Sequence, residues 1–123
     1  MVLKVEDLDI YQMAEDLADK IWDMCSAWDY FTKDTIGKQL VRAADSISAN
    51  LAEGHARYHF KDRLNFCYYA QGSLEETKTW VLKARRRKLI ESEEIDLIEG
   101  IIDTLPKKLN AYIGSIKRAK KDD

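Results

Sequence analysis

A regular repeat of apolar residues, spaced by alternate steps of three and four, runs through the last quarter of the chain. The repeat covers three heptads, and this spacing places its members along one side of a helix. Its members are Ile95, Ile98, Ile102, Leu105, Leu109, Tyr112 and Ile116. Such a stripe is the seam of a left-handed helical bundle, so the repeat predicts that the chain folds as packed helices.

The sequence also indicates the ends of this helix, which we expect to run from about residue 92 to 118. Ser92 can cap its first turn, and the acidic residues that follow suit the positive end of a helix dipole. Pro106 lies inside the helix and leaves the carbonyl of Ile102 without its usual donor, so we expect a kink. The charged residues 117–123 are expected to form a frayed tail.

Three further segments show helical spacing of apolar residues, and we expect helices over about residues 8–28, 35–53 and 60–88. Gly54 is placed to end the second of these helices, because glycine adopts the left-handed conformation of a helix C-terminus without a Cβ penalty. The following turn is expected over 54–59. The side chains expected to cap the second helix are Thr32, Asp34 and Thr35.

The segment 60–88 has apolar residues on two sides, so its helix is expected to have two neighbours. One stripe contains Cys67, Ala70, Leu74 and Val81. The second stripe contains Leu64, Tyr68 and Leu82, and a lone bundle would leave it partly exposed. We therefore expect Leu64, Tyr68 and Leu82 to form an interface between copies of the chain.

The composition agrees with a small helical protein. The 123 residues include 46% hydrophobic and 34% charged residues, which suits one domain with one core. One proline and five glycines are too few for a collagen-like or turn-rich all-β chain. Four helices with short connections pack most simply as an up-down-up-down bundle, so we expect an all-α, four-helix bundle in a single domain over residues 1–123.

Charge is distributed unevenly along the chain. With 20 basic and 22 acidic residues, the whole molecule is not a general binder of polyanions. Residues 1–34 carry three basic and nine acidic side chains, whereas residues 35–90 carry eleven basic and five acidic ones. The cations gather in a turn group, Arg57, Lys61 and Arg63, and in a helix-end quartet, Arg85, Arg86, Arg87 and Lys88. In an antiparallel bundle these two groups lie at opposite ends.

The quartet has two interpretations. Cations at a helix C-terminus complement the dipole and stay solvated, at about 0.3 to 1 kcal/mol each. Four consecutive cations wrap around the helix and cannot all serve its last carbonyls, which favours contacts with phosphates. On this second interpretation the quartet is the main nucleic-acid site and the turn group a secondary one. Most aromatic residues lie beside core stripes, and Tyr58 is the one we expect to be exposed in a basic setting.

The sequence contains no arrangement typical of catalysis or metal binding. Cys25 and Cys67 lie on apolar faces without CxxC spacing and are expected to be buried, reduced thiols. His55 and His59 are four residues apart, but the expected turn separates them, so we expect no metal site. We also expect no enzymatic activity and no cofactor, since no nucleophile-elbow or phosphate-loop motif occurs. No secretory or membrane-spanning segment is evident, which predicts a cytoplasmic protein.

The central half of the chain carries a more specific pattern. The runs IGKQLVRAADSISANLAEGHAR (36–57) and FKDRLNFCYYAQGSLEETKTWVLKA (60–84) resemble the four-helix-bundle family encoded in intervening sequences of bacterial 23S rRNA genes. The family pattern is approximately L..Q.RRAA.SI..N.AEG..R, followed by F..FL..A.GSL.E. The matching residues are Gln39, Arg42, Ala43, Ala44, Ser46, Ile47, Asn50, Ala52, Glu53, Gly54, Arg57, Phe60, Ala70, Gly72, Ser73, Leu74 and Glu76. Val41 departs from the pattern by replacing a basic residue, and Ser48 by replacing a common proline.

The motif also has a structural interpretation. Its small residues Ala43, Ala44, Gly72 and Ser73 allow two helices of one hairpin to approach closely. Asn50 and Glu53 precede the turn, where they could bond backbone amides around Gly54 or pair with Arg57.

The resemblance implies a compact homo-oligomer, most readily a pentamer, in a family whose biochemical role is largely undefined. It is also similar to accessory variability proteins of diversity-generating retroelements, which form basic pentameric barrels and work with a reverse transcriptase and its RNA. The resemblance therefore implies low-specificity binding of RNA or DNA and a reverse transcriptase as a partner. A purely structural protein–protein interaction module is the alternative, because fold analogy does not establish function.

Overall fold

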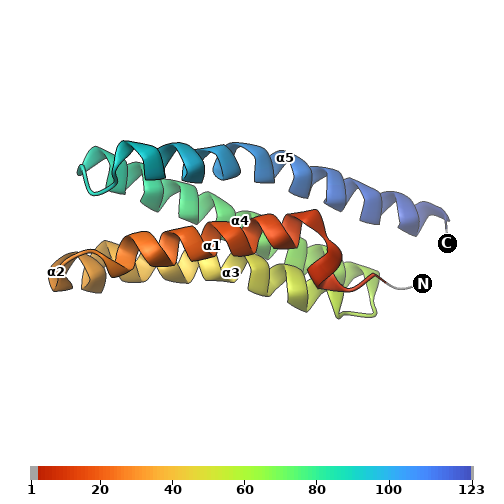
Figure 1. The fold of residues 1–123 in the computed structure, drawn as a ribbon. Coiled ribbons are helices and arrows are strands. Elements are labelled where there is room, and N and C mark those ends of the chain that lie inside the picture. Colours follow the sequence, from red (N-terminus) through yellow and green to blue (C-terminus); the bar gives the residue numbers. More distant parts are fainter. Residues whose placement is uncertain (1–2, 123) are drawn as a thin grey trace.

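The computed structural model describes the backbone of residues 3–122 and the side chains of residues 3–120. Four long helices run antiparallel to their neighbours in sequence (Figure 1). They are α1 (Asp9–Ser26), α3 (Lys38–His55), α4 (Phe60–Arg86) and α5 (Ser92–Asp122). No strand occurs among the described residues, so the expected all-α, up-down-up-down bundle is confirmed.

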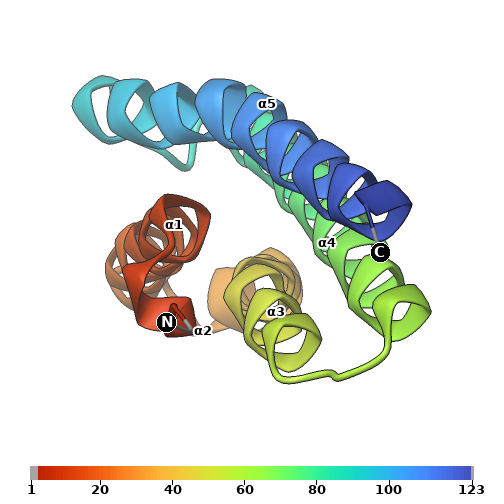
Figure 2. The same ribbon diagram turned by 90° about the vertical axis from the view of Figure 1, so that its right-hand side faces the viewer.

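The helices form two layers that lie across one another. α1 and α3 make one layer, and α4 and α5 make the other, which crosses the first diagonally (Figure 2). Each helix packs against two others, in the order α1, α3, α4, α5 and back to α1. The expectation that the helix after residue 60 has two neighbours is therefore confirmed.

The predicted apolar stripes form the core between these layers. In α5, Ile98, Leu105 and Leu109 are almost fully buried. They meet Leu17 of α1 and Leu40 of α3 in one continuous cluster of buried side chains. Ile95 and Tyr112 are only partly buried at its edge. Burial of this seam is what stabilises a helix as long as α5 in water.

The start of the second predicted helix differs from expectation. Asp29 caps it, since its Oδ1 accepts a hydrogen bond of 2.9 Å from the backbone N–H of Thr32. Helical structure therefore begins at α2 (Tyr30–Thr32) and passes through a π-helical turn, η2 (Lys33–Gly37), into α3. The expected caps Thr32, Asp34 and Thr35 all lie inside this helical stretch. Sequence reasoning selected three oxygen-bearing residues and missed Asp29, which lies just before them.

Gly54 does not end α3 as predicted. It lies in the last turn, where it is buried, and the helix continues to His55. The φ angle of Gly54 is not positive, so the glycine is not needed for a left-handed backbone conformation. A Cβ added at Gly54 would lie 2.9 Å from Cβ of Phe66 and 3.3 Å from the carbonyl oxygen of Arg63. The glycine is needed because α3 and α4 approach closely at their turn.

The left-handed residue is instead Lys88, with φ of 59°. The N–H of Leu89 donates to the carbonyl of Ala84 at 2.9 Å, and the N–H of Lys88 donates to that of Arg85 at 3.0 Å. This pair of bonds is the Schellman arrangement that ends a helix. α4 accordingly ends at Arg86, two residues earlier than expected.

Two other helix ends differ from the sequence expectation. α1 ends at Ser26, where residue 28 was expected. α5 continues unbroken through Pro106 to Asp122, and its ribbon is curved (Figure 1). The prediction of a frayed tail is therefore wrong as far as Asp122, and Asp123 lies outside the described residues. Propagating an existing helix costs little, so charged residues can extend it.

Candidate functional site

The quartet Arg85 to Lys88 lies where α4 ends and turns towards α5. Nη1 of Arg85 lies 2.9 Å from Oε1 of Glu99 on α5, so this cation is in an ion pair. Arg86, Arg87 and Lys88 are exposed. Within residues 3–120, none of these three is in an ion pair. The quartet thus presents three cations to solvent, one of them on the left-handed residue of the turn.

The turn between α4 and α5 is hydrogen-bonded to Trp28, which lies two residues after the end of α1. Nε1 of Trp28 donates a 3.0 Å hydrogen bond to the backbone carbonyl of Leu89. Gly37, in the π turn, packs close to the same indole, since an added Cβ would lie 3.5 Å from Trp28 Cε3. The π turn and the α4–α5 turn are therefore at one end of the bundle, which we call the α4–α5 end (Figure 1).

Charges of both signs meet at the α4–α5 end. Besides the quartet it carries Lys33 and Lys38, which lie in or directly after the π turn. Glu91, Glu93 and Glu94 follow the quartet in sequence and are exposed as well. This end is therefore a mixed surface with a cationic part on α4 and the π turn, and an acidic part at the start of α5.

The turn group lies at the opposite end of the bundle, as predicted, and two of its three cations, Arg57 and Arg63, have close neighbours in the chain. Arg57 forms an ion pair with Glu53 and lies 4.9 Å from the centre of the Phe66 ring. Arg63 is half-buried, and its Nε has no hydrogen-bond partner among the described residues. Of the three cations, Lys61 is exposed and outside the ion pairs of residues 3–120. The secondary nucleic-acid site at Arg57, Lys61 and Arg63 stays a prediction.

Near Arg63, α4 and α5 share a partly buried polar contact. Burial raises the pKa of the Tyr112 hydroxyl, and the neighbouring Arg63 guanidinium opposes this rise. Arg63 and Tyr112 both line a pocket beside Phe60.

The first half of the family motif has mainly structural contacts. Nδ2 of Asn50 donates to the carbonyl of Ser46 at 2.8 Å, one helical turn earlier, so it does not bond the turn amides as proposed. The predicted pair of Glu53 with Arg57 is confirmed. Ala43 and Ala44 are buried, as expected for close helix packing.

The second half of the motif differs in part from expectation. Gly72 is exposed, and an added Cβ would meet nothing within 4 Å, so it does not serve close packing within this chain. The carbonyl of Ser73 accepts a 2.7 Å bond from Thr77 Oγ1. Oε1 of Glu76 accepts a 3.3 Å bond from Trp80 Nε1. These contacts lie within α4 and indicate a local structural role for Ser73 and Glu76.

The predicted interface stripe on α4 is only partly available to a partner. Leu64 is half-buried and packs against the core of its own chain. Tyr68 and Leu82 are 41% and 50% exposed. Tyr58 is exposed as expected, and several other aromatic residues are exposed as well, although most aromatics were expected on or beside the core stripes. They are Trp22, Tyr30, Phe31 and Tyr69.

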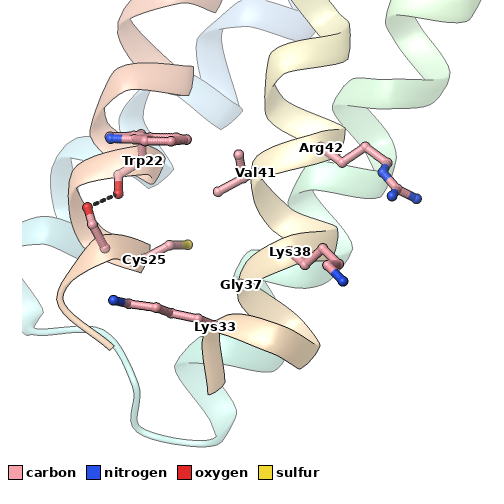
Figure 3. Close-up of a pocket in the computed structure, with 8 residues that line it drawn as sticks. Trp22, Cys25, Lys33, Gly37, Lys38, Val41 and Arg42 are labelled. Carbon is pink, nitrogen blue, oxygen red and sulfur yellow. Dashed lines mark hydrogen bonds between the residues drawn. The ribbon is translucent and has the colours of Figure 1, made fainter. Parts of the chain in front are cut away.

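One of these aromatics lines a pocket that sequence reasoning missed. The pocket has a volume of about 490 Å³ and lies between α1 and the stretch from the π turn into α3. Trp22, Cys25 and Val41 form its apolar part (Figure 3). Lys33 crosses its lower side, whereas the side chains of Lys38 and Arg42 start beside it on α3 and extend away from Trp22 (Figure 3).

The pocket depends on the π turn. A π turn inserts one extra residue into a helix and commonly marks a functional position. Here the turn carries Lys33 and Gly37, which both line the pocket. No sequence pattern announces a π turn, which explains why this site was not predicted. The one available hint in the sequence was Trp22, a large aromatic residue that is not part of the apolar stripe of its helix.

The thiols and histidines offer no reactive centre. Burial raises the pKa of the Cys25 thiol to about 12 and also raises that of Cys67. Both cysteines are free and buried, as predicted. Nε2 of His55 lies 2.6 Å from the carbonyl of Leu3, and His59 packs edge-on against Tyr58. Over the described part of the chain, no group of three metal-binding side chains comes together.

Two comparisons with known proteins bear on this fold. The sequence profile of the 23S rRNA-intervening sequence protein family matches residues 6–111. A crystal structure of a protein with unknown function, from the S23 ribosomal protein family of Bacteroides thetaiotaomicron, has the same fold with a TM-score of 0.75. It is 22% identical to this chain, and the match covers 85% of this chain and 97% of that one.

Two searches gave negative results. No curated protein is significantly similar to this chain. None of the described helices is both long and apolar enough to cross a bilayer.

The profile match extends over all four helices, from before α1 into α5, and includes the motif whose contacts are described above. The chain therefore belongs to the 23S rRNA-intervening sequence protein family.

Proposed function

We propose that this protein is a non-enzymatic, homo-oligomeric accessory protein that binds RNA or DNA with low sequence specificity through the α4–α5 end. One observation carries the proposal. Arg86 and Arg87 are exposed, adjacent, and outside the ion pairs of residues 3–120. Cations without a carboxylate partner can neutralise phosphates without first breaking an ion pair.

The neighbouring cations of the π turn add to this surface. Lys33 is exposed and forms no ion pair within residues 3–120. The bond between Trp28 and the carbonyl of Leu89 joins the segments that carry Lys33 and Arg87. Phosphate contacts position a nucleic acid without reading its bases, so we expect low specificity. A dissociation constant on the order of 10⁻⁴ to 10⁻⁶ M per site is typical of such binding at physiological salt.

Self-association would repeat this surface and strengthen its field. It is supported by Tyr68 and Leu82, large side chains that α4 presents to solvent. A ring of copies multiplies a modest cationic patch although each chain is slightly acidic overall. Five copies, a reverse transcriptase as partner and a cytoplasmic location stay predictions drawn from the sequence.

The test is the salt dependence of RNA binding. In the double variant Arg86→Ala/Arg87→Ala, two phosphate contacts are lost. Each contact to a single strand contributes about 0.7 to the slope of log K against log salt, so we expect the slope to fall by about 1.4. Fluorescence anisotropy of a labelled single-stranded RNA of mixed sequence measures this slope.

The matched control is Lys78→Ala/Lys107→Ala, which removes the same charge from exposed positions in the middle of the bundle. It should leave the slope nearly unchanged. Equal slopes for all three proteins would contradict the phosphate contacts. That result would favour a structural interaction module, for which the ion pair of Arg85 with Glu99 and the acidic start of α5 are the supporting observations.

A further inference from the structure

We propose that a pocket between the start of α4 and the last turns of α5 binds a nucleoside monophosphate, with its phosphate at Arg63 and its base against Tyr58 and Phe60. We call this site the Arg63 pocket. Such a group can come from a free nucleotide or from the 5′-phosphorylated end of a nucleic-acid strand. The inference does not depend on the RNA contacts proposed for Arg86 and Arg87, because a free nucleotide can occupy the pocket on its own.

The Arg63 pocket has the size of a small-molecule site. Its volume is about 340 Å³, and such sites typically have about 300 to 1,000 Å³. It lies at the end of the bundle where α1 begins and α5 ends (Figure 1). Phe60 and Arg63 of α4 line it together with Tyr58, which precedes α4, and with Tyr112 and Ser115 of α5. One cavity therefore combines a cation, hydroxyl groups and aromatic rings.

The cation of this pocket has a donor without a partner. Nε of Arg63 is shielded from solvent, and it has no hydrogen-bond partner among the described residues. Arg63 is also outside the ion pairs of residues 3–120. The adjacent carboxylate, Asp62, lies about 100° further around the helix. A buried donor without a partner is costly, so an oxyanion that accepts a hydrogen bond from Nε relieves this cost.

The α5 side of the pocket adds a second donor and an acceptor. Burial raises the pKa of the Tyr112 hydroxyl, although the Arg63 guanidinium beside it opposes the rise. Tyr112 therefore keeps its proton at neutral pH and can donate it to the same oxyanion. Oγ of Ser115 donates to the carbonyl of Tyr112 at 2.7 Å. The lone pairs of this oxygen are left to accept a hydrogen bond from a ribose hydroxyl.

Aromatic rings are available for a flat group. Tyr58 is 92% exposed, so most of its ring is uncovered. Phe60 also lines the pocket, and Nζ of Lys120 lies 5.2 Å from the centre of its ring. Every base has a face that stacks on an aromatic ring, so we expect little preference among bases.

The charge of the site favours a phosphate over a carboxylate. Arg63 and Lys120 bring two positive charges, and Lys120 is likewise outside the ion pairs of residues 3–120. A phosphate monoester carries nearly two negative charges at neutral pH and has three acceptor oxygens, whereas a carboxylate carries one charge on two oxygens. A phosphate attached to a flat aromatic group is the chemistry of a nucleotide.

The first experiment compares three probes on the full chain by isothermal titration calorimetry. They are adenosine monophosphate, adenosine and inorganic phosphate. We expect the nucleotide to bind at least about tenfold more tightly than either part, because it uses the charged contacts and the stacking together. In Arg63→Gln, which retains hydrogen-bonding groups but removes the charge, its affinity should fall at least about tenfold.

A second variant and a matched control separate this contact from folding and from general charge. Tyr58→Leu changes a side chain on the surface, so it should fold normally and bind the nucleotide at least about fivefold more weakly. Arg118→Gln removes the same charge as Arg63→Gln from an exposed position on α5 outside the pocket lining, and should change the affinity less than about twofold. Circular dichroism checks that each variant keeps its helices.

A further comparison distinguishes the two sources of the nucleotide. The probes are two single-stranded RNAs of one sequence, one with a 5′-phosphate and one with a 5′-hydroxyl. They are compared in Arg86→Ala/Arg87→Ala, so that contacts at the α4–α5 end do not mask a difference. Tighter binding of the phosphorylated RNA that disappears on adding Arg63→Gln assigns the pocket to strand ends. Equal binding of both RNAs beside tight binding of adenosine monophosphate assigns it to the free nucleotide.

Three results would overturn the inference. One is a nucleotide that binds no more tightly than adenosine or inorganic phosphate. Another is unchanged nucleotide affinity in both Arg63→Gln and Tyr58→Leu. The last is an equal loss in Arg63→Gln and Arg118→Gln, which would show attraction by net charge alone. The proposed RNA contacts fail separately, since losing them in Arg86→Ala/Arg87→Ala leaves the Arg63 pocket intact.

Discussion

The two turns that flank α4 both carry clusters of cations but differ in structure. Each follows a long helix and carries three or four cations. At the α3–α4 turn, Gly54 allows α4 to approach closely, and Arg57 and Arg63 are engaged with Glu53, Phe66 and the surroundings of Tyr112. At the α4–α5 turn, the chain bends at a left-handed lysine, and Arg86 and Arg87 point into solvent without such partners.

This difference shows that a count of cations does not measure how many are available to a ligand. A cation that already pairs with a carboxylate or covers an aromatic ring must lose that contact before it binds a phosphate. The closeness of α3 and α4 at their turn brings Phe66 near Arg57, whereas Glu53 lies one helical turn before Arg57 on the same segment. Within residues 3–120, Glu99 is the only carboxylate that forms an ion pair with the quartet at the α4–α5 turn.

The largest effect is expected for Gly54→Ala at the α3–α4 turn. The new methyl would lie 2.9 Å from Cβ of Phe66, so the hairpin must shift. Overpacking of this kind costs about 1 to 3 kcal/mol, which exceeds the gain of about 1 kcal/mol in helix propensity from glycine to alanine. Urea denaturation at fixed protein concentration should show a lower midpoint with an unchanged slope.

Gly72→Ala is the matched control for this substitution. Gly72 also lies inside a helix, but nothing lies within 4 Å of an added Cβ. The same glycine-to-alanine change should therefore stabilise the chain by about 0.5 to 1 kcal/mol. If both variants shifted stability in the same direction, close approach at Gly54 would not distinguish the two sites.

A smaller effect of opposite sign is expected for Lys88→Gly at the α4–α5 turn. Lys88 has φ of 59°, which costs a residue with a side chain about 1 to 2 kcal/mol and costs glycine little. Glycine also loses more chain entropy on folding, which leaves a net gain of about 0.5 to 1 kcal/mol. Urea denaturation of Lys88→Gly beside Lys88→Ala measures it, and alanine, which keeps the strain, should give no gain.

The smallest effect is expected for Arg57→Ala in RNA binding. Since Arg57 is held by Glu53 and lies over Phe66, its loss should leave the salt slope unchanged within error. The loss of an exposed ion pair should cost less than about 1 kcal/mol of stability. Fluorescence anisotropy with the RNA used for Arg86→Ala/Arg87→Ala measures the slope. If the salt slope decreased as much as in that variant, the cations at the two ends of the bundle would be equally available to RNA, contrary to the proposal.

Much of the fold could be predicted because the helices of this chain are strongly periodic. The seam of α5 and the stripes of the other helices identified the core, and the number and direction of the helices followed. The helix ends were less accurate. Thr32, Asp34 and Thr35 have the same capping chemistry as Asp29, so composition alone could not choose among them.

The candidate site was predicted only in part. The quartet could be found in the sequence because its four residues are consecutive. The pocket could not, because it is lined by Trp22 of α1 and by Lys33, Lys38 and Arg42 of a later segment. Helical spacing placed most aromatics on or beside the core stripes, and several aromatics are exposed, because a residue beside a stripe can face solvent.

The sequence by itself determined that the chain forms four amphipathic helices, in what order they follow, which family they belong to, and where its cations gather. These properties depend on residue type and spacing along one helix. The tertiary structure alone decided which cations are available, why Gly54 is a glycine, and that Trp22 and the π turn line one pocket. These depend on distances between segments, which periodicity within a segment does not contain.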